Sequence, residues 1–234
     1  MKLKKYIIDT SQSIQHFNVV LYRIQALIDF DDIRAGDYGG YVESEKNLSH
    51  SGNCWIYDNA KVYGCGRVNS NAKIYNRAEV RCEAVISDNA KIFGEAIISG
   101  EAKVYGNAIV SGKVSVFDKS RVFDDAVIEG NSIILYGPKV RVFENAHIYN
   151  EAKILGKARV FGNATVKDKA IVKGSAKIYG SAIISENAQV MNKARIYTKT
   201  LPGNYRTVSE ISGNACINKR IRIFDLKINT GLIN

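Results

Sequence analysis

The sequence predicts an all-β fold in which the chain winds as a coil of short strands that stack in parallel from turn to turn. Three observations carry this prediction. A small residue recurs at every sixth position from Ala60 onward, and a β-branched aliphatic residue follows two positions after it. Gly, Asn, Asp and Ser crowd the two positions that complete each unit, as at 106–107 and 162–163.

Each six-residue unit has the alternation of a strand. Residues two apart lie on the same face of a strand, so the small and the branched residue point inward and the residues beside them point outward. A period of six fits a helix poorly, and β-branched residues favour strands. Two-residue corners that always turn the chain the same way exclude hairpins between successive units, so each unit pairs with the next turn.

The repeat frame is interrupted once. It runs from Ala60 to Ser132 and Ile134, slips by two residues within 135–140 ("LYGPKV"), and resumes at Val142. We expect the two extra residues to bulge out at a corner and to leave the winding of the coil intact.

The ends of such a coil need covers, because they expose apolar core and unpaired backbone. We expect residues 1–50 to form an N-terminal β cap and residues 51–197 to form the coil. Residues 198–234 are expected to form a loop, a last turn and a C-terminal cap, since hexad spacing returns at Ala215 and Ile217.

The pattern resembles that of the hexapeptide-repeat proteins, in which an aliphatic residue is followed four positions later by a small one. The pairs Val62/Gly66, Val104/Ala108 and Val160/Ala164 match it. The resemblance implies a single-stranded triangular parallel β-helix, normally left-handed, with three units and 18 residues in each turn. Residues 23–60 also resemble the opening of YdcK-type chains, a subfamily of putative hexapeptide transferases found in bacteria and phages. The same coil carries acyltransferases, carbonic anhydrase relatives and scaffolds, so fold alone does not give the activity.

The formal net charge is +10, and the excess of positive charge lies in residues 51–234. A basic surface of this size favours anionic partners. The chain has no apolar run near the roughly 18 to 20 residues that cross a bilayer, and its start lacks the apolar core of a secretory signal. We therefore expect a soluble, cytoplasmic protein with no membrane partner.

The sequence predicts no metal and no cofactor. Its four cysteines lack C-x-x-C spacing and clustered histidines, which makes free thiols the expectation. The acids of residues 29–37 ("DFDDIRAGD") are read as a polar turn of the cap in preference to a metal site. The glycines are corner residues spaced by six, not a phosphate-binding loop.

Residues eighteen apart stack in columns, and one face then carries a basic column beside an aromatic column. The basic column is Lys103, Arg121, Arg141, Arg159, Lys177 and Arg195, and the aromatic column is Tyr105, Phe123, Phe143, Phe161, Tyr179 and Tyr197. Three interpretations remain open. The aromatic residues alone could stabilise the ladder, the face could be a subunit interface, or it could bind an anionic macromolecule such as nucleic acid or an acidic protein.

Our leading hypothesis is a non-enzymatic binding or scaffold protein that engages an anionic macromolecule through this face, with rings stacking on bases and cations meeting phosphates. Because similar chains occur in phages, interference with a host nucleic-acid machine is one form that this function could take.

Two alternatives remain. The first is an acyl-CoA-dependent acyltransferase acting as a trimer, with His147 or His50 as general base; His147 is the candidate for a catalytic residue. The second is self-assembly into a dimer or trimer through isoleucines expected to be exposed. These are Ile97, Ile109, Ile133, Ile171 and Ile183.

Overall fold

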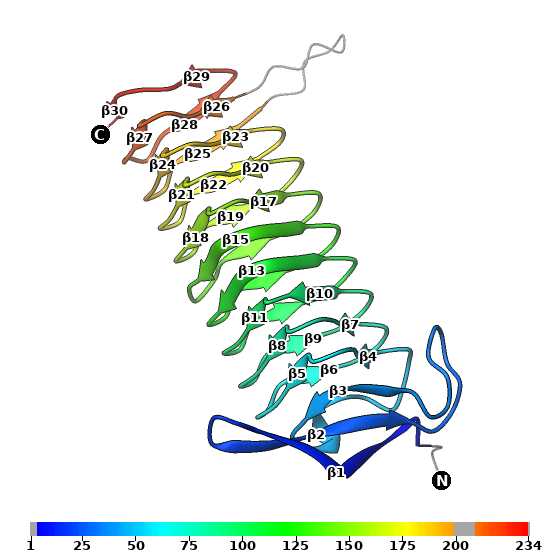
Figure 1. Ribbon diagram of the computed structural model, residues 1–234. Coiled ribbons are helices and arrows are strands. Elements are labelled where there is room, and N and C mark those ends of the chain that lie inside the picture. Colours follow the sequence, from blue (N-terminus) through cyan, green and yellow to red (C-terminus); the bar gives the residue numbers. More distant parts are fainter. Residues whose placement is uncertain (1–3, 199–208, 234) are drawn as a thin grey trace.

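The computed structural model describes residues 4–198 and 209–233 and shows a parallel β-solenoid of about ten turns (Figure 1). Each turn contributes one short strand to each of three walls. Strands of successive turns pair in parallel with a spacing of eighteen residues, as in Lys91 with Ile109. The predicted all-β coil with 18-residue turns is therefore confirmed.

Two of the walls belong to one sheet, because long strands run round the corner between them. The first wall contains β4 (Trp55–Ile56), β7 (Lys73–Ile74), β10 (Lys91–Gly94), β17 (His147–Tyr149), β20 (Thr165–Val166), β23 (Ile183–Ile184), β26 (Glu210–Ile211) and β29 (Lys227–Ile228). The second contains β5 (Lys61–Val62), β8 (Glu79–Val80), β11 (Ile97–Ile98), β18 (Lys153–Leu155), β21 (Ile171–Val172), β24 (Gln189–Val190), β27 (Cys216–Ile217) and β30 (Leu232–Ile233). The strands β13 (Ile109–Phe117) and β15 (Val127–Tyr136) join the two walls.

The third wall is a separate nine-stranded sheet, which we call the basic wall. Its strands are β6 (Arg67–Val68), β9 (Val85–Ile86), β12 (Lys103–Val104), β14 (Arg121–Val122), β16 (Arg141–Val142), β19 (Arg159–Val160), β22 (Lys177–Tyr179), β25 (Arg195–Tyr197) and β28 (Arg222–Phe224).

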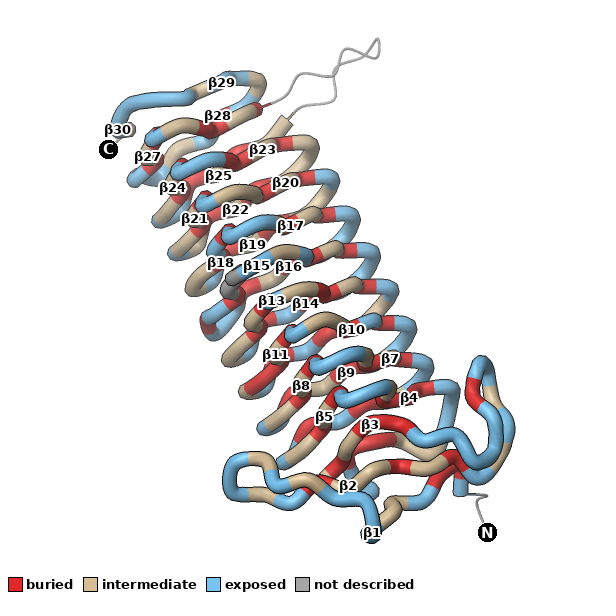
Figure 2. Tube along the Cα trace, viewed as in Figure 1, coloured by how far each residue is buried: buried red, intermediate tan, exposed pale blue. Residues whose placement is uncertain are grey.

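The core is a stack of alanines and branched aliphatic residues that runs the length of the coil (Figure 2). Ala60 and Val62 are fully buried, as are Ala78 and Val80 on the next turn and Ala96 and Ile98 on the turn after it. Backbone hydrogen bonds run from each turn to the next, as from Lys61 N–H to the Ala78 carbonyl at 2.9 Å. Corner residues such as Asp58 adopt left-handed backbone with φ of 53°, a conformation that Asp tolerates better than most residues.

The interruption of the frame is split between two corners. Val122 pairs with Val142, which is twenty positions later, whereas Leu135 pairs with Ile154, which is nineteen positions later. One extra residue therefore enters before Leu135, where the register with β13 shifts, and the other enters after it. The prediction that Ile134 fills the inward position is wrong, because Leu135 is the residue that pairs with Ile154 and is fully buried. One residue is all that a bulge adds at a corner, so the winding continues as expected.

An antiparallel hairpin covers the first turn. Its strands are β1 (Tyr6–His16) and β2 (Val19–Ala26), and β2 pairs with β3 (Tyr38–Val42), which already pairs in parallel with the coil strand β5. A short 3-10 helix, η1 (Glu45–Asn47), follows. Tyr6 and Trp55 are fully buried at this end and meet edge to face, with ring centroids 6.2 Å apart.

At the other end the coil continues after residue 208, within the segment expected to hold a last turn and a cap. Strands β26 to β30 stack on the turn before them, and Ala215 and Ile217 are fully buried. The predicted irregular segment falls mainly on residues 199–208, which lie outside the described residues. Over the described part of the chain there is no helix of the length and apolarity that a membrane crossing requires.

Candidate functional site: the basic wall

The basic wall holds a continuous column of cations. Lys103 pairs with Arg121, and Arg121 pairs with Arg141 across the interruption of the frame. The column continues beyond the six predicted residues to Arg222, which pairs with Arg195. The seven cations in register are Lys103, Arg121, Arg141, Arg159, Lys177, Arg195 and Arg222.

The aromatic residues form a stack of parallel rings beside this column. Ring centroids from Tyr105 to Tyr197 are 4.7 to 5.0 Å apart, and the planes of neighbouring rings differ by 0 to 5°. Phe224 extends the stack, with its ring 5.8 Å from that of Tyr197 and tilted by 34°. Each inner ring therefore has another ring against both faces.

This geometry corrects one sequence-based expectation. A base needs a free ring face, or a gap of about two stacking distances, to stack on an aromatic residue. The faces of the inner rings are already occupied by their neighbours at 5.0 Å or less, so they do not offer the predicted stacking platforms for bases. The aromatic column instead stabilises the ladder, and the cations remain to be explained.

The cations of the column repel one another. Within residues 4–198 and 209–233, no carboxylate lies within ion-pair distance of any of the seven. Partial burial lowers the pKa of Lys177, and the neighbouring charges of Arg159 and Arg195 lower it further. Like charges directly opposite each other destabilise a sheet, so the column costs the fold some stability.

A second set of charges lies at the corner that precedes the basic wall, two positions before the column. Towards the N-terminus this corner carries Glu83 and Glu101, and Glu101 pairs with Lys119 at 2.9 Å. Towards the C-terminus it carries only cations, apart from one serine. These residues are Lys139, Lys157, Ser175, Lys193 and Arg220. The positive charge of the wall therefore increases along the coil.

The sequence reading missed this corner set and the extension to Arg222 and Phe224. The corner residues share the eighteen-residue spacing, so the same spacing would have predicted them. The extension was harder to find, because the segment 199–208 breaks the spacing before Arg222.

The candidate base His147 lies on the first wall. Its Nε2 is 3.1 Å from Glu129 Oε1, its side chain is 39% exposed, and its ring centroid is 5.0 Å from that of Tyr149. Glu129 and His147 belong to adjacent turns, since β15 pairs with β17. The pair has the form of a base with an orienting carboxylate, on an open surface.

His50 is part of the N-terminal cap. It stacks on Tyr6 with ring centroids 4.3 Å apart, and its Nδ1 accepts a hydrogen bond from the backbone N–H of Lys5 at 3.3 Å. Partial burial lowers the pKa of His50. These contacts give it a packing role in the cap.

The acids of residues 29–37 tie a cap loop to the coil. Lys73 on the first wall contacts Asp31 at 2.6 Å and Asp32 at 2.7 Å, and Tyr57 donates a hydrogen bond to Asp32 at 2.8 Å. Burial by itself would lower the pKa of Lys73, but the hydrogen bonds to the two aspartates raise it above its ordinary value. The loop is a polar tether: Lys73 occupies the carboxylates of Asp31 and Asp32, and those of Asp29 and Asp37 accept backbone hydrogen bonds within the loop.

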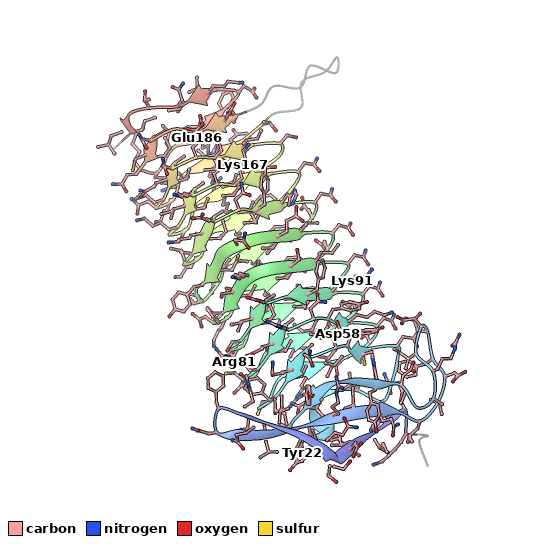
Figure 3. All side chains as sticks on the ribbon, in the orientation of Figure 1. Tyr22, Asp58, Arg81, Lys91, Lys167 and Glu186 are labelled. Atoms are coloured by element: carbon pink, nitrogen blue, oxygen red, sulfur yellow. The ribbon has the colours of Figure 1, made fainter. Side chains whose placement is uncertain are left out.

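Four of the five isoleucines expected to serve self-assembly are half-buried. These four are Ile97, Ile109, Ile171 and Ile183, and the side chain of Ile133 lies outside those described. In register, Ile134 and not Ile133 occupies the matching position on the second wall, opposite Lys153. Figure 3 shows how side chains project from each turn and lie against those of its neighbours.

Comparison with known proteins gives a match to a short segment of the chain. No protein-family model matches the chain. A segment of 48 residues, 20% of the chain, is 50% identical to the uncharacterized acetyltransferase YdcK of Escherichia coli strain K12. The matched segment spans 15% of the length of that relative. This relative and the eighteen-residue turns together confirm the resemblance to hexapeptide-repeat β-helices of the YdcK type.

Proposed function

We propose that the protein is a β-helical binding protein whose basic wall holds a linear polyanion along the axis of the coil. The observation that supports the proposal is the register of seven cations on successive turns, from Lys103 to Arg222, none of which forms an ion pair with another described residue. An anion that binds the folded wall offsets the repulsion between these cations and so stabilises the fold.

The favoured ligand is a single nucleic-acid strand held by its phosphates. Five of the seven cations are arginines, whose guanidinium groups bind phosphate oxygens in pairs. Because the inner ring faces are occupied, the bases would contact ring edges or point to solvent. Binding is therefore expected to depend on length and salt, and only weakly on base sequence.

Charge reversal on the wall tests the proposal. Fluorescence anisotropy would measure binding of a labelled single strand to the wild type and to the triple variant Arg121→Glu, Arg141→Glu and Arg159→Glu. We expect the variant to lose at least about a hundredfold in affinity, and wild-type binding to weaken steeply as salt rises.

The matched control reverses three exposed lysines away from the wall. It carries Lys91→Glu, Lys153→Glu and Lys169→Glu, so its net charge equals that of the wall variant. Equal losses in both variants would mean that net charge alone governs binding, and would refute the proposal. Parallel measurements with poly-glutamate and inorganic polyphosphate separate an acidic protein segment from a phosphate polymer.

A second candidate function is acyl transfer from acyl-CoA. Two observations favour it: the relative YdcK is named an acetyltransferase, and His147 lies 3.1 Å from Glu129 as a base with an orienting carboxylate would. Stabilisation by acetyl-CoA in a thermal-shift assay, together with a transfer activity lost in His147→Gln, would support it. Absence of both effects would refute acyl transfer and leave polyanion binding as the proposed function.

A further inference from the structure

The C-terminal end of the basic wall is hollowed. The hollow has a volume of about 380 Å³ and is open to solvent. It is lined by Ser175, Lys177, Lys193, Arg195, Arg220, Ile221 and Arg222. These residues come from three successive turns, because Lys177 pairs with Arg195 and Arg195 with Arg222.

The lining is a two-column array of cations. On each turn one residue comes from the corner and one from the wall, which gives Ser175 with Lys177, Lys193 with Arg195, and Arg220 with Arg222. Five of the six positions are cationic, the sixth is a hydroxyl, and none of the described residues that line the hollow is a carboxylate. Turns about 4.8 Å apart spread this array over about 10 Å of the axis, which fits a short chain of phosphates.

The opposite end of the same wall provides an internal comparison. A hollow of about 420 Å³ there is lined by Cys65, Arg67, Glu83, Val85, Glu101 and Lys103. These residues occupy the same corner and wall positions on three earlier turns. Two carboxylates balance the two cations in that hollow, so it is neutral. The coil thus forms a hollow at both ends of the wall. The C-terminal hollow is cationic because of the residues that occupy its corner and wall positions.

We propose that the C-terminal hollow is a separate binding site for a compact, multiply charged phosphate group, a di- or triphosphate. Arg195, Arg220 and Arg222 supply guanidinium groups that bind phosphate oxygens in pairs, and Lys177 and Lys193 supply point charges. The Ser175 hydroxyl can donate one more hydrogen bond. The volume is in the range of small-ligand sites.

Independent observations agree with an anion site at this place. None of the five cations has an ion-pair partner within the described part of the chain. Neighbouring cations depress the pKa of Lys177 in addition to its burial, which a bound anion would reverse. Lys193, Arg220 and Arg222 are exposed, so their side chains can close over a ligand.

The site does not rest on the proposed polyanion function, and the two can be separated. Lys193 and Arg220 line the hollow but lie outside the column of seven. Arg121, Arg141 and Arg159 belong to the column but do not line the hollow. A variant in one set therefore tests one proposal and leaves the other intact.

Isothermal titration calorimetry with inorganic triphosphate, at low and fixed ionic strength, tests the site. We expect the wild type to bind triphosphate more tightly than orthophosphate, and the variant Lys193→Ala with Arg220→Ala to lose at least about tenfold in triphosphate affinity. The control variant, Arg67→Ala with Lys91→Ala, removes two exposed cations elsewhere and is expected to bind like the wild type.

A nucleoside triphosphate in the same assay separates two sources of the phosphate group. Equal affinity for the free and the nucleoside-bound triphosphate assigns recognition to the phosphates, and tighter binding of the nucleoside form adds a contact from the base or sugar. Either result supports the site. The proposal is overturned if triphosphate does not bind, or if both double variants lose affinity equally.

Discussion

Phe123 and Phe143 lie face to face across the point where two extra residues enter the chain, with ring centroids 4.9 Å apart and parallel planes. They are twenty positions apart, whereas Phe143 and Phe161 are eighteen apart and stack at the same 4.9 Å. The two extra residues therefore lie at the corners, and the ring stacking on the basic wall is the same across the interruption as beyond it.

Truncation of a middle ring measures what the stack contributes. Phe143→Ala removes two ring contacts at once, and we expect it to lower the free energy of unfolding by about 1 to 2 kcal/mol. Urea denaturation followed by circular dichroism would measure the change. Phe93→Ala is the control, because Phe93 is a half-buried aromatic residue of the first wall without a stacked ring partner in the described residues. Similar losses in both variants would show that the stack adds nothing beyond burial.

Gly130 is a corner position at which a side chain does not fit. Its φ is +148°, and a Cβ added there would lie 2.5 Å from the Asn150 carbonyl oxygen on the next turn. We expect Gly130→Ala to cost about 3 kcal/mol or more, because both the backbone conformation and the contact are unfavourable. Gly64→Ala, at φ +61° with the nearest atom 3.4 Å away, should cost about 1 kcal/mol in the same denaturation assay. Equal costs would contradict the assignment of strain to this corner.

The six-residue period was sufficient to predict the coil, because the same two inward positions decide the burial of every turn. It placed Arg121 beside Arg141 correctly, even across the interruption, since a shift at a corner does not alter which residues face outward afterwards. It assigned the inward position to Ile134, whereas Leu135 is the residue that is buried there. Both are aliphatic, and only the pairing with Ile154 distinguishes them.

Less of the candidate site than of the fold could be predicted from the sequence. The order of the cations in the column followed from the eighteen-residue spacing. Whether the ring faces are free or stacked on one another did not. Aromatic residues at strand spacing are compatible with a free platform and with a closed stack, and the 5.0 Å distance between Tyr105 and Phe123 decides for the stack. The C-terminal hollow was not predicted, because it needs Arg220 and Arg222 to align with Lys193 and Arg195 beyond a segment that breaks the spacing.

The N-terminal cap should weaken when His50 is protonated. Partial burial lowers the folded pKa of His50, and the nearby charges of Lys4 and Lys5 add to this while Glu45 opposes it. The unfolded chain, with a pKa of about 6.5, then binds more protons, so stability is lost as pH falls below about 6.5. Urea midpoints between about pH 7 and 5 should decline more steeply for the wild type than for His50→Asn. Parallel declines would rule out His50 as the titrating group.

If the cation column is maintained for a ligand, removing one of its charges should stabilise the free protein. Arg159 faces Arg141 on one side and Lys177 on the other. We expect Arg159→Gln to raise the free energy of unfolding at low salt by about 0.2 to 1 kcal/mol, and the gain to vanish at high salt, where the repulsion is screened. Lys119→Gln is the contrasting variant, because it removes a cation that pairs with Glu101 at 2.9 Å and should give no gain. Thermal denaturation at both salt concentrations would measure these changes. A loss of stability in Arg159→Gln would mean that the column stabilises the fold itself, and the need for an anionic ligand would disappear.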